Sequence, residues 1–253
     1  MNENKFNGMG KLYAQYRPSY PKEFLEYLYS DAGASENSII ADIGSGTGIL
    51  TRQLLEKGCK VYAVEPNADM RAIAETELRA FDRFTSVNGS AEYTSLSDNS
   101  IEIITVAQAF HWFDRQRFSV ECHRVLVPLG IVVLVWNTRD EKSELVREND
   151  AVIKKYCPDF MGYSGGTRGP ESDDDLNDFF VGNYDIKAFR NDLIFDEQGF
   201  IGRNLTGSYA PKEKDRAYPA YIEALKSLFD KYSNDGQIIL PNITRSYVGR
   251  IGV

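Results

Sequence analysis

Residues 39–50 read IIADIGSGTGIL, and this stretch decides the fold. An apolar run leads to an aspartate, and glycines then occupy the alternate positions 44, 46 and 48 before a second apolar segment begins. The apolar run predicts a buried strand, and ILTRQLLEKG (49–58) predicts a helix with leucines on one face and Gly58 at its end. Glycines between a strand and a helix let a ligand approach the backbone, next to the exposed N–H groups of the helix start. The stretch therefore predicts a ligand-binding turn in an α/β domain.

The same alternation of strand and helix continues to about Asn137. The patterns predict strands at 38–44, 60–66, 84–92, 101–110 and 131–137, and helices at 49–58, 67–81 and 115–130. Strands that read as continuous apolar runs, with helices between them, are typical of a parallel sheet covered on both faces. Two later strands, at 184–196 and 243–251, are expected to join this sheet.

We therefore expect one α/β domain, a doubly wound, Rossmann-like, mostly parallel seven-stranded sheet with a helical cap inserted in the C-terminal half. The predicted parts are an N-terminal aromatic arm and helix (1–37), a cofactor-binding core (38–137), a cap and substrate region (138–235) with one core strand near 185–195, and a final strand (236–253).

The composition is that of a soluble globular protein. Of the 253 residues, 42% are hydrophobic and 26% are charged, and the longest uninterrupted apolar run, Ile131–Trp136, is too short to span a bilayer. The formal charge of −8 and the lack of a clustered Lys/Arg patch argue against a nucleic-acid partner. The first residues lack the apolar core of a signal peptide, so we expect a cytoplasmic protein. Three scattered cysteines without a C-x-x-C pair predict buried, reduced thiols.

Two classes of ligand use a glycine turn at this place, dinucleotides and S-adenosylmethionine. The dinucleotide fingerprint G-x-G-x-x-G/A fails because Ile49 occupies its third small position. Asp42 would be badly placed beside a pyrophosphate, whereas it suits a cationic ligand. Glu65 ends the second predicted strand, where a carboxylate can accept hydrogen bonds from the ribose hydroxyls of either ligand. A P-loop is excluded because no Gly-Lys-Ser/Thr follows the turn.

Four segments, ADIGSGTG, VYAVEP, GSAEYTSLSDNSIEIITVAQAFHWFD and ECHRVLVPLGIVVLVWN, resemble class I S-adenosylmethionine-dependent methyltransferases. Together with YRPSYP upstream, they are similar to the small-molecule branch that includes trans-aconitate methyltransferase-like proteins. The resemblance covers about residues 10–137 well and the last third only loosely. One departure is VPLG at 127–130, where relatives often carry a glycine pair, and we expect it to alter a turn without altering the chemistry.

The resemblance implies S-adenosylmethionine as cofactor and implies which residues bind it. The glycine turn, with Asp42 beneath it, and Gln108 would lie at the methionine part, Glu65 at the ribose, and residues 66–67 and 90–92 at the adenine. The implied cofactor-binding residues are Tyr13, Tyr16, Arg17, Asp42, Gly44, Ser45, Gly46, Gly48, Glu65, Pro66, Asn67, Ser90, Ala91, Glu92 and Gln108.

The methyl acceptor must be inferred from fewer residues. Aromatic faces attract a sulfonium, and Trp112 in the FHWF segment after the fourth predicted strand is a candidate contact, with core packing as its alternative. His111 is the only histidine at the expected ligand edge, so it is the candidate general base or substrate anchor, unless it is a structural loop residue. A carboxylate acceptor would need no base, and Arg139, Arg168 or Arg203 in the cap region could bind it. No closely spaced His/Asp/Glu set suggests a metal.

The sequence thus predicts a methyltransferase that modifies a small molecule, acting as a monomer or homodimer with no nucleic-acid or membrane partner. The acceptor atom is expected to be an oxygen of a carboxylate or acidic hydroxyl. Two alternatives stay open at this point, a nicotinamide-dependent oxidoreductase and a non-catalytic protein that binds S-adenosylmethionine.

Overall fold

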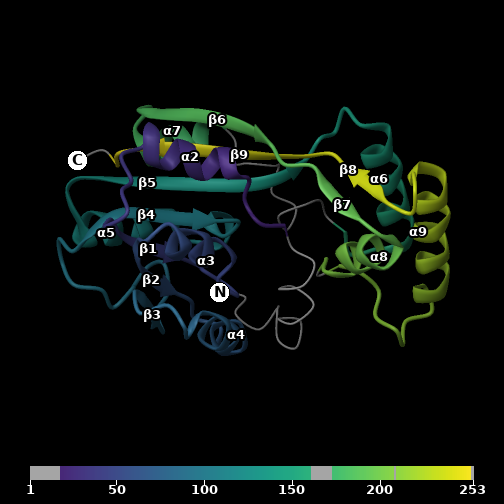
Figure 1. The fold of residues 1–253 in the computed structure, drawn as a ribbon, viewed down its shortest axis with the longest axis horizontal. Helices are drawn as coiled ribbons and strands as arrows, with labels where there is room; N and C mark the ends of the chain where they lie inside the picture. The colour runs from purple at the N-terminus through teal and green to yellow at the C-terminus, as the bar shows by residue number, and fades with distance from the viewer. Residues whose placement is uncertain (1–17, 161–172, 208, 252–253) are drawn as a thin grey trace.

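The computed structural model describes residues 18–160, 173–207 and 209–251. Its main sheet has seven strands in the order β3-β2-β1-β4-β5-β9-β6 (Figure 1). The strands are β1 (Ile39–Ile43), β2 (Lys60–Val64), β3 (Phe84–Val87), β4 (Ile101–Ala107), β5 (Leu126–Arg139), β6 (Tyr184–Arg190) and β9 (Asn242–Gly249). Only β9 runs antiparallel to its neighbours β5 and β6. The predicted fold class is confirmed.

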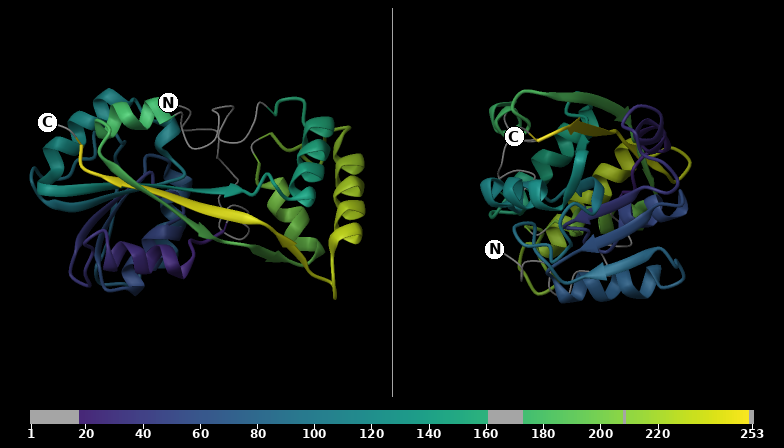
Figure 2. Two further views of the ribbon diagram at one scale, coloured as in Figure 1. Left: turned by 90° about the horizontal axis from the view of Figure 1, so that it is seen from above. Right: turned by 90° about the vertical axis from the view of Figure 1, so that its left-hand side faces the viewer.

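Helices cover both faces of this sheet (Figure 2). On one face α5 (Arg115–Val125) and α7 (Asp173–Phe180) pack on side chains such as Ile104 and Leu134. On the other face α2 (Lys22–Ser30), α3 (Ile49–Glu56) and α4 (Ala68–Leu78) pack on Ile103 and Val133. Successive residues of one strand thus serve opposite cores, which explains why the strands read as continuous apolar runs.

The cap is a separate lobe beyond the carboxyl end of β5 (Figure 1). It contains α6 (Glu144–Tyr156), α8 (Glu197–Leu205) and α9 (Tyr218–Tyr232), together with a two-stranded ribbon of β7 (Leu193–Phe195) and β8 (Ile238–Leu240). These elements share their own hydrophobic core, which includes the fully buried Phe200, Tyr221 and Leu225. The cap therefore has a core of its own, distinct from the two cores that flank the main sheet.

Several predicted boundaries were wrong. The strands predicted at 84–92 and 101–110 end at Val87 and Ala107. The helix predicted at 115–130 ends at Val125, because Leu126 already pairs with Ile101 of β4 as the first residue of β5. The strand predicted at 184–196 is divided into β6, which pairs with β9, and β7, which pairs with β8 in the cap ribbon. In the VPLG segment Leu129 has a φ of 70° and lies exposed, in a backbone conformation that glycine adopts without strain. Within the described residues, no helix combines the length and apolarity that crossing a membrane requires.

Candidate active site

The glycine turn predicted from the sequence lies between β1 and α3. Gly44, Gly46 and Gly48 all have left-handed φ values, of 69°, 56° and 83°. A Cβ on Gly44 would lie 2.6 Å from the Cβ of Ala109, and one on Gly48 would lie 2.7 Å from Cδ1 of Leu78. A Cβ on Gly46 would meet no atom within 4 Å in the described structure. The outer two glycines thus allow close packing of the turn, whereas Gly46 faces open space.

A pocket of about 510 Å³, counted out to its opening to solvent, lies against this turn. Its walls come from the N-terminal arm, the glycine turn, the carboxyl ends of β4 and β5, and α8 of the cap. The lining residues are Pro18, Tyr20, Asp42, Gly44, Ser45, Gly46, Thr47, Ile49, Leu50, Ala107, Gln108, Asn137 and Arg203. The pocket therefore lies at the carboxyl edge of the parallel strands, between the sheet and the cap.

Glu65 follows β2 and holds the turn from the side. Its Oε2 accepts the N–H of Gly46 at 2.9 Å, and its Oε1 accepts the N–H of Asn67 at 2.8 Å. Burial raises the pKa of this carboxyl, while the two backbone N–H groups oppose the rise. A carboxylate oxygen can accept more than one hydrogen bond, so both oxygens retain capacity for hydroxyl donors of a ligand.

Asp42, the last but one residue of β1, is fully buried. Its Oδ2 accepts the hydroxyl of Thr51 on α3 at 2.6 Å, and its Oδ1 accepts the hydroxyl of Thr105 on β4 at 2.9 Å. Burial raises its pKa to about 6. The carboxylate therefore joins two strands and a helix beneath the pocket, in addition to lining it.

The predicted adenine-side residues follow β2 and β3. Arg71 links the two segments, since its Nη1 donates to the backbone oxygen of Glu65 at 2.8 Å and to Oδ1 of Asn88 at 3.2 Å. Asn67 caps α4 by accepting the N–H of Met70, and Pro66 lies directly before it. Ser90, Ala91 and Glu92 begin the connection to β4, and Ala91 is buried against the core. None of these residues lines the pocket described above, which covers the predicted methionine side.

The arm segment 18–20 is fixed from two sides. Gln53 of α3 accepts the N–H of Tyr20 at 3.0 Å and donates to its carbonyl at 2.7 Å. The carbonyl of Ser19 accepts hydrogen bonds from Asn191 at 3.0 Å and from Asn137 at 3.4 Å. These contacts keep Pro18 and Tyr20 in the pocket wall.

Gln108 directly follows β4 and has a φ of 61°, which is unusual for a residue other than glycine. Its N–H donates to the carbonyl of Val135 at 3.0 Å, and its Nε2 donates to the carbonyl of Asn137 at 3.1 Å. Strained backbone of this kind is often found at ligand sites. Here it turns the chain sharply at the pocket floor.

The predicted acceptor-side residues are less close together. His111 and Trp112 lie on the short helix η2 (Phe110–Trp112), with ring centroids 4.7 Å apart, and neither lines the pocket. Arg139 ends β5, two residues beyond the pocket residue Asn137. Tyr13, Tyr16, Arg17 and Arg168 lie outside the described residues. Phe110 is fully buried among aromatic rings of the core, as expected for packing.

Comparison with known proteins shows the family to which this chain belongs. A family model described as a methyltransferase domain matches residues 41–134. An uncharacterized methyltransferase-like protein of Schizosaccharomyces pombe is 31% identical over 233 residues, which are 90% of this chain and 88% of that protein. The chain belongs to the S-adenosylmethionine-dependent methyltransferases. Membership of this family agrees with the predicted class I methyltransferase and argues against a nicotinamide-dependent oxidoreductase. Membership of the trans-aconitate-like branch stays a prediction.

Other relatives match this chain over a smaller share of their own length, or share only its fold. An uncharacterized methyltransferase of Mycobacterium tuberculosis is 41% identical over 141 residues, so the match spans 56% of this chain and about half (55%) of that relative. A structure from Anaeromyxobacter dehalogenans, provisionally assigned as a type II methyltransferase, has a TM-score of 0.62 at 23% identity and covers 93% of this chain and 98% of its own. A phosphoethanolamine N-methyltransferase of Haemonchus contortus has a TM-score of 0.56 at 14% identity, over 100% of this chain and 58% of its own.

The residues of this chain fit the family's cofactor. Three buried oxygens, Oγ of Ser45, Oγ1 of Thr47 and Oε2 of Glu92, have no hydrogen-bond partner in the described part of the chain. Buried polar atoms are normally paired, so the oxygens of Ser45 and Thr47, which line the pocket, are available to a ligand there, whereas Glu92 does not line it. The three oxygens lie in the glycine turn and in the segment after β3, which are the predicted methionine and adenine sides.

Several pocket residues were not predicted as site residues. Asn137 ends the fifth predicted strand, and a polar residue at the carboxyl end of a buried strand is the signal that could have identified it. Arg203 was considered only as one of three cap arginines. Gln53 does not line the pocket but binds the backbone of Tyr20, and it gave no signal because a glutamine on an amphipathic helix resembles any surface residue.

Proposed function

We propose that this chain transfers the methyl group of S-adenosylmethionine to a small-molecule acceptor at an oxygen atom, either a carboxylate or an acidic hydroxyl. Membership of the family supports the cofactor and the type of reaction. The observation that carries the acceptor class is the position of Arg203, which α8 of the cap brings into the pocket lining. Arginine binds carboxylates through two parallel N–H donors.

The charge balance of the pocket supports an anionic acceptor. Asp42 is the only acidic residue among the described pocket-lining residues, and both its oxygens already accept threonine hydroxyls. Tyr20, Gln108 and Asn137 add polar groups to the same walls. An acceptor that arrives as a carboxylate is already deprotonated, so the proposal requires no general base, in agreement with the position of His111 outside this pocket.

The chain's own contribution would be alignment and shielding. The cofactor supplies an activated methyl group, so the protein has to orient the acceptor oxygen and exclude water. The glycine turn and Glu65 would hold the cofactor from the sheet side, and Arg203 would hold the acceptor from the cap side. Because Arg203 lies on α8 of the cap and the glycine turn lies beside the main sheet, the acceptor would be bound between the two lobes.

The cofactor part can be tested by titration with S-adenosylhomocysteine. Gly46→Val should weaken binding by at least about 30-fold. The added side chain would project into the open space beside the turn, which the cofactor is proposed to occupy. Gly33→Val is the matched control, since Gly33 has a φ of 80° and also meets no described atom within 4 Å, but lies after α2. Both variants carry the same backbone strain, so equal affinities would refute the cofactor assignment.

The acceptor part can be tested with S-adenosylmethionine labelled at the methyl group and a metabolite panel of carboxylates, phenols, alcohols and amines. We expect transfer to a carboxylate or acidic hydroxyl, and at least a tenfold loss of kcat/KM in Arg203→Met without a change in S-adenosylhomocysteine affinity. Transfer mainly to neutral amines would contradict the acceptor class. Cofactor binding without transfer to any compound would favour the non-catalytic alternative.

A further inference from the structure

The seven-stranded sheet ends on one side in β6, whose outer backbone edge has no strand beside it in the described part of the chain. β6 is the outermost strand at the top of Figure 1. Its seven residues, Tyr184–Arg190, pair inward with β9. An edge strand presents a row of backbone N–H and C=O groups that can pair with another chain. We call this row, with the side chains of residues 184–190, the β6 edge.

The other end of the sheet, β3, offers less surface to a second chain. β3 has four residues, of which only Thr85 is exposed. Its Ser86 donates a hydrogen bond to Glu75 of α4 at 2.7 Å, so the helix covers part of the strand. In β6, by contrast, the four consecutive residues 185–188 are all exposed. Of the two ends of the sheet, β6 is therefore the one that a second chain can reach.

The side chains of the β6 edge alternate between the two faces of the sheet. On the face covered by α2, Nζ of Lys187 lies 5.8 Å from the centroid of the Tyr27 ring, and Asp185 shares this face two residues away. On the opposite face the ring of Tyr184 packs on α7, and Ile186 shares that face and is 53% exposed. The exposed part of the edge thus presents one acid and one base on one face and an isoleucine on the other.

The order of these charges decides how two copies of β6 can pair. A lysine on an edge strand usually opposes such pairing. A two-fold axis that is normal to the sheet and passes through Ile186, however, places Asp185 of each copy opposite Lys187 of the other, and does so twice. Directly opposed side chains of antiparallel strands have Cβ atoms about 4.5–5.5 Å apart, which is close enough for an ion pair. An axis through Lys187 or through Asp185 would instead bring two like charges together.

We propose that the β6 edge binds a second copy of this chain, with the two β6 strands antiparallel about Ile186, so that two seven-stranded sheets join into one. Each copy uses the same surface, as in other two-fold dimers. Neither Asp185 nor Lys187 forms an ion pair with a described residue of its own chain, so both charges are available to the other copy. The two Ile186 side chains would meet at the axis and bury apolar surface. The proposal does not depend on the proposed function, because no β6 residue is among the described pocket-lining residues.

Sedimentation velocity of the full chain over a concentration series measures this association. Wild type should dimerise with a Kd in the micromolar range, because an interface built on one pair of strands is small. Asp185→Lys and Lys187→Asp should each raise the Kd about tenfold or more, since each variant brings two pairs of like charges together. Ile186→Glu should also raise it, because two carboxylates would meet at the axis. Ile194→Glu is the matched control, since Ile194 is 59% exposed on β7 of the cap ribbon and lies outside the β6 edge.

A mixture of the two charge variants tests the register. In the mixture one copy carries lysine at both positions and the other carries aspartate at both, so Asp185→Lys and Lys187→Asp should associate with each other about as tightly as wild type does with itself. The protein with both exchanges should likewise dimerise on its own.

Three results would overturn the proposal: a wild type that stays monomeric throughout the series, a dimer whose Kd none of the three β6 variants changes, or a mixture that does not recover the association. Melting followed by circular dichroism checks that each variant is folded. Ile186→Glu keeps the interface testable if one of the charge variants does not fold.

Discussion

At the scale of single residues, Asp42 shows how one acid can be both structural and close to the ligand. Its carboxylate joins β1 to α3 and β4 through two threonine hydroxyls, so the floor of the pocket depends on it. Burial raises its pKa from 3.8 to about 6, against the effect of those hydroxyls. The folded protein therefore binds a proton at Asp42 more tightly than the unfolded chain does.

This difference predicts how stability depends on pH. The contribution of Asp42 to the free energy of unfolding should be complete below pH 3.8 and should be lost as the pH rises through about 6. At about 1.4 kcal/mol per pKa unit, the loss amounts to about 3 kcal/mol. Urea unfolding at pH 4 and pH 7 should show this fall in wild type and not in Asp42→Asn. Asp82→Asn, at an exposed position, is the control and should show the same fall as wild type. A fall in the free energy of unfolding of Asp42→Asn as large as that of wild type would contradict the prediction.

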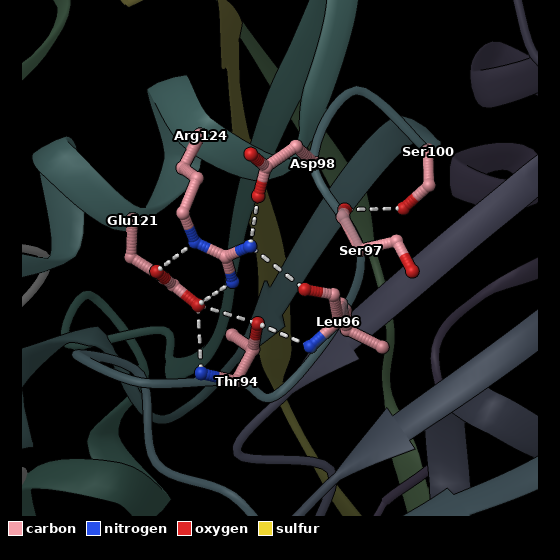
Figure 3. Close-up of polar contacts among 7 residues, drawn as sticks. All are labelled: Thr94, Leu96, Ser97, Asp98, Ser100, Glu121 and Arg124. Atoms are coloured by element: carbon pink, nitrogen blue, oxygen red, sulfur yellow. Dashed lines mark hydrogen bonds and ion pairs between the residues drawn. The ribbon is translucent and has the colours of Figure 1, made fainter.

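The partners of Asp42 also show what the sequence could predict here. The acid, the glycines and Glu65 were identified because their spacing places them at the end of adjacent strands. Thr105 lies 63 residues from Asp42, so its contact follows from β4 pairing with β1, which no local pattern specifies. The hydrogen bond from Thr94 to Glu121 was not predicted for the same reason, since the two residues are 27 positions apart (Figure 3).

At the scale of elements, the arm at residues 18–20 is held by contacts that are distant in sequence. Gln53 binds both backbone groups of Tyr20, and Asn191 reaches Ser19 from 172 positions away. The helical and strand patterns predicted where most elements lie, because apolar periodicity is local. Their ends were less predictable, and α5 gave way to β5 at Leu126 because strand pairing with β4 overrode the helical pattern.

Gln53→Glu tests whether the arm contributes to ligand binding. The substitution retains an acceptor for the N–H of Tyr20 but places a second acceptor against its carbonyl, so the arm should detach from α3. Losing one such hydrogen bond costs about 0.5–1.5 kcal/mol. If this cost appears in ligand binding, S-adenosylhomocysteine should bind about three- to tenfold more weakly to the variant than to wild type. Calorimetric titration would measure this, with Gln198→Glu on the exposed side of α8 as the control. Equal affinity of Gln53→Glu and wild type would show that the arm is not part of the binding site.

At the scale of the whole molecule, the cap and the sheet are two packed bodies with the pocket between them. Leu225 of α9 is fully buried in the cap core, and Leu54 of α3 is fully buried beside the sheet. Either leucine replaced by alanine should cost about 2–5 kcal/mol. Because the two cores are separate, the substitutions should affect different parts of the molecule.

Hydrogen exchange can measure this separation. In Leu225→Ala the amides of α6, α8 and α9 should exchange faster while those of β1 and β4 keep their protection. In Leu54→Ala the amides of the sheet should lose protection. Uniform loss of protection in both variants would show that the cap and sheet unfold as one cooperative unit.

The separate core of the cap also has an evolutionary consequence. Mutations that reshape α8 or α9 can accumulate without disturbing the turn at Gly44–Gly48, because the side chains that support each are different. A gene lineage could therefore acquire a new acceptor by divergence in one lobe while it inherits the methyl donor site unchanged.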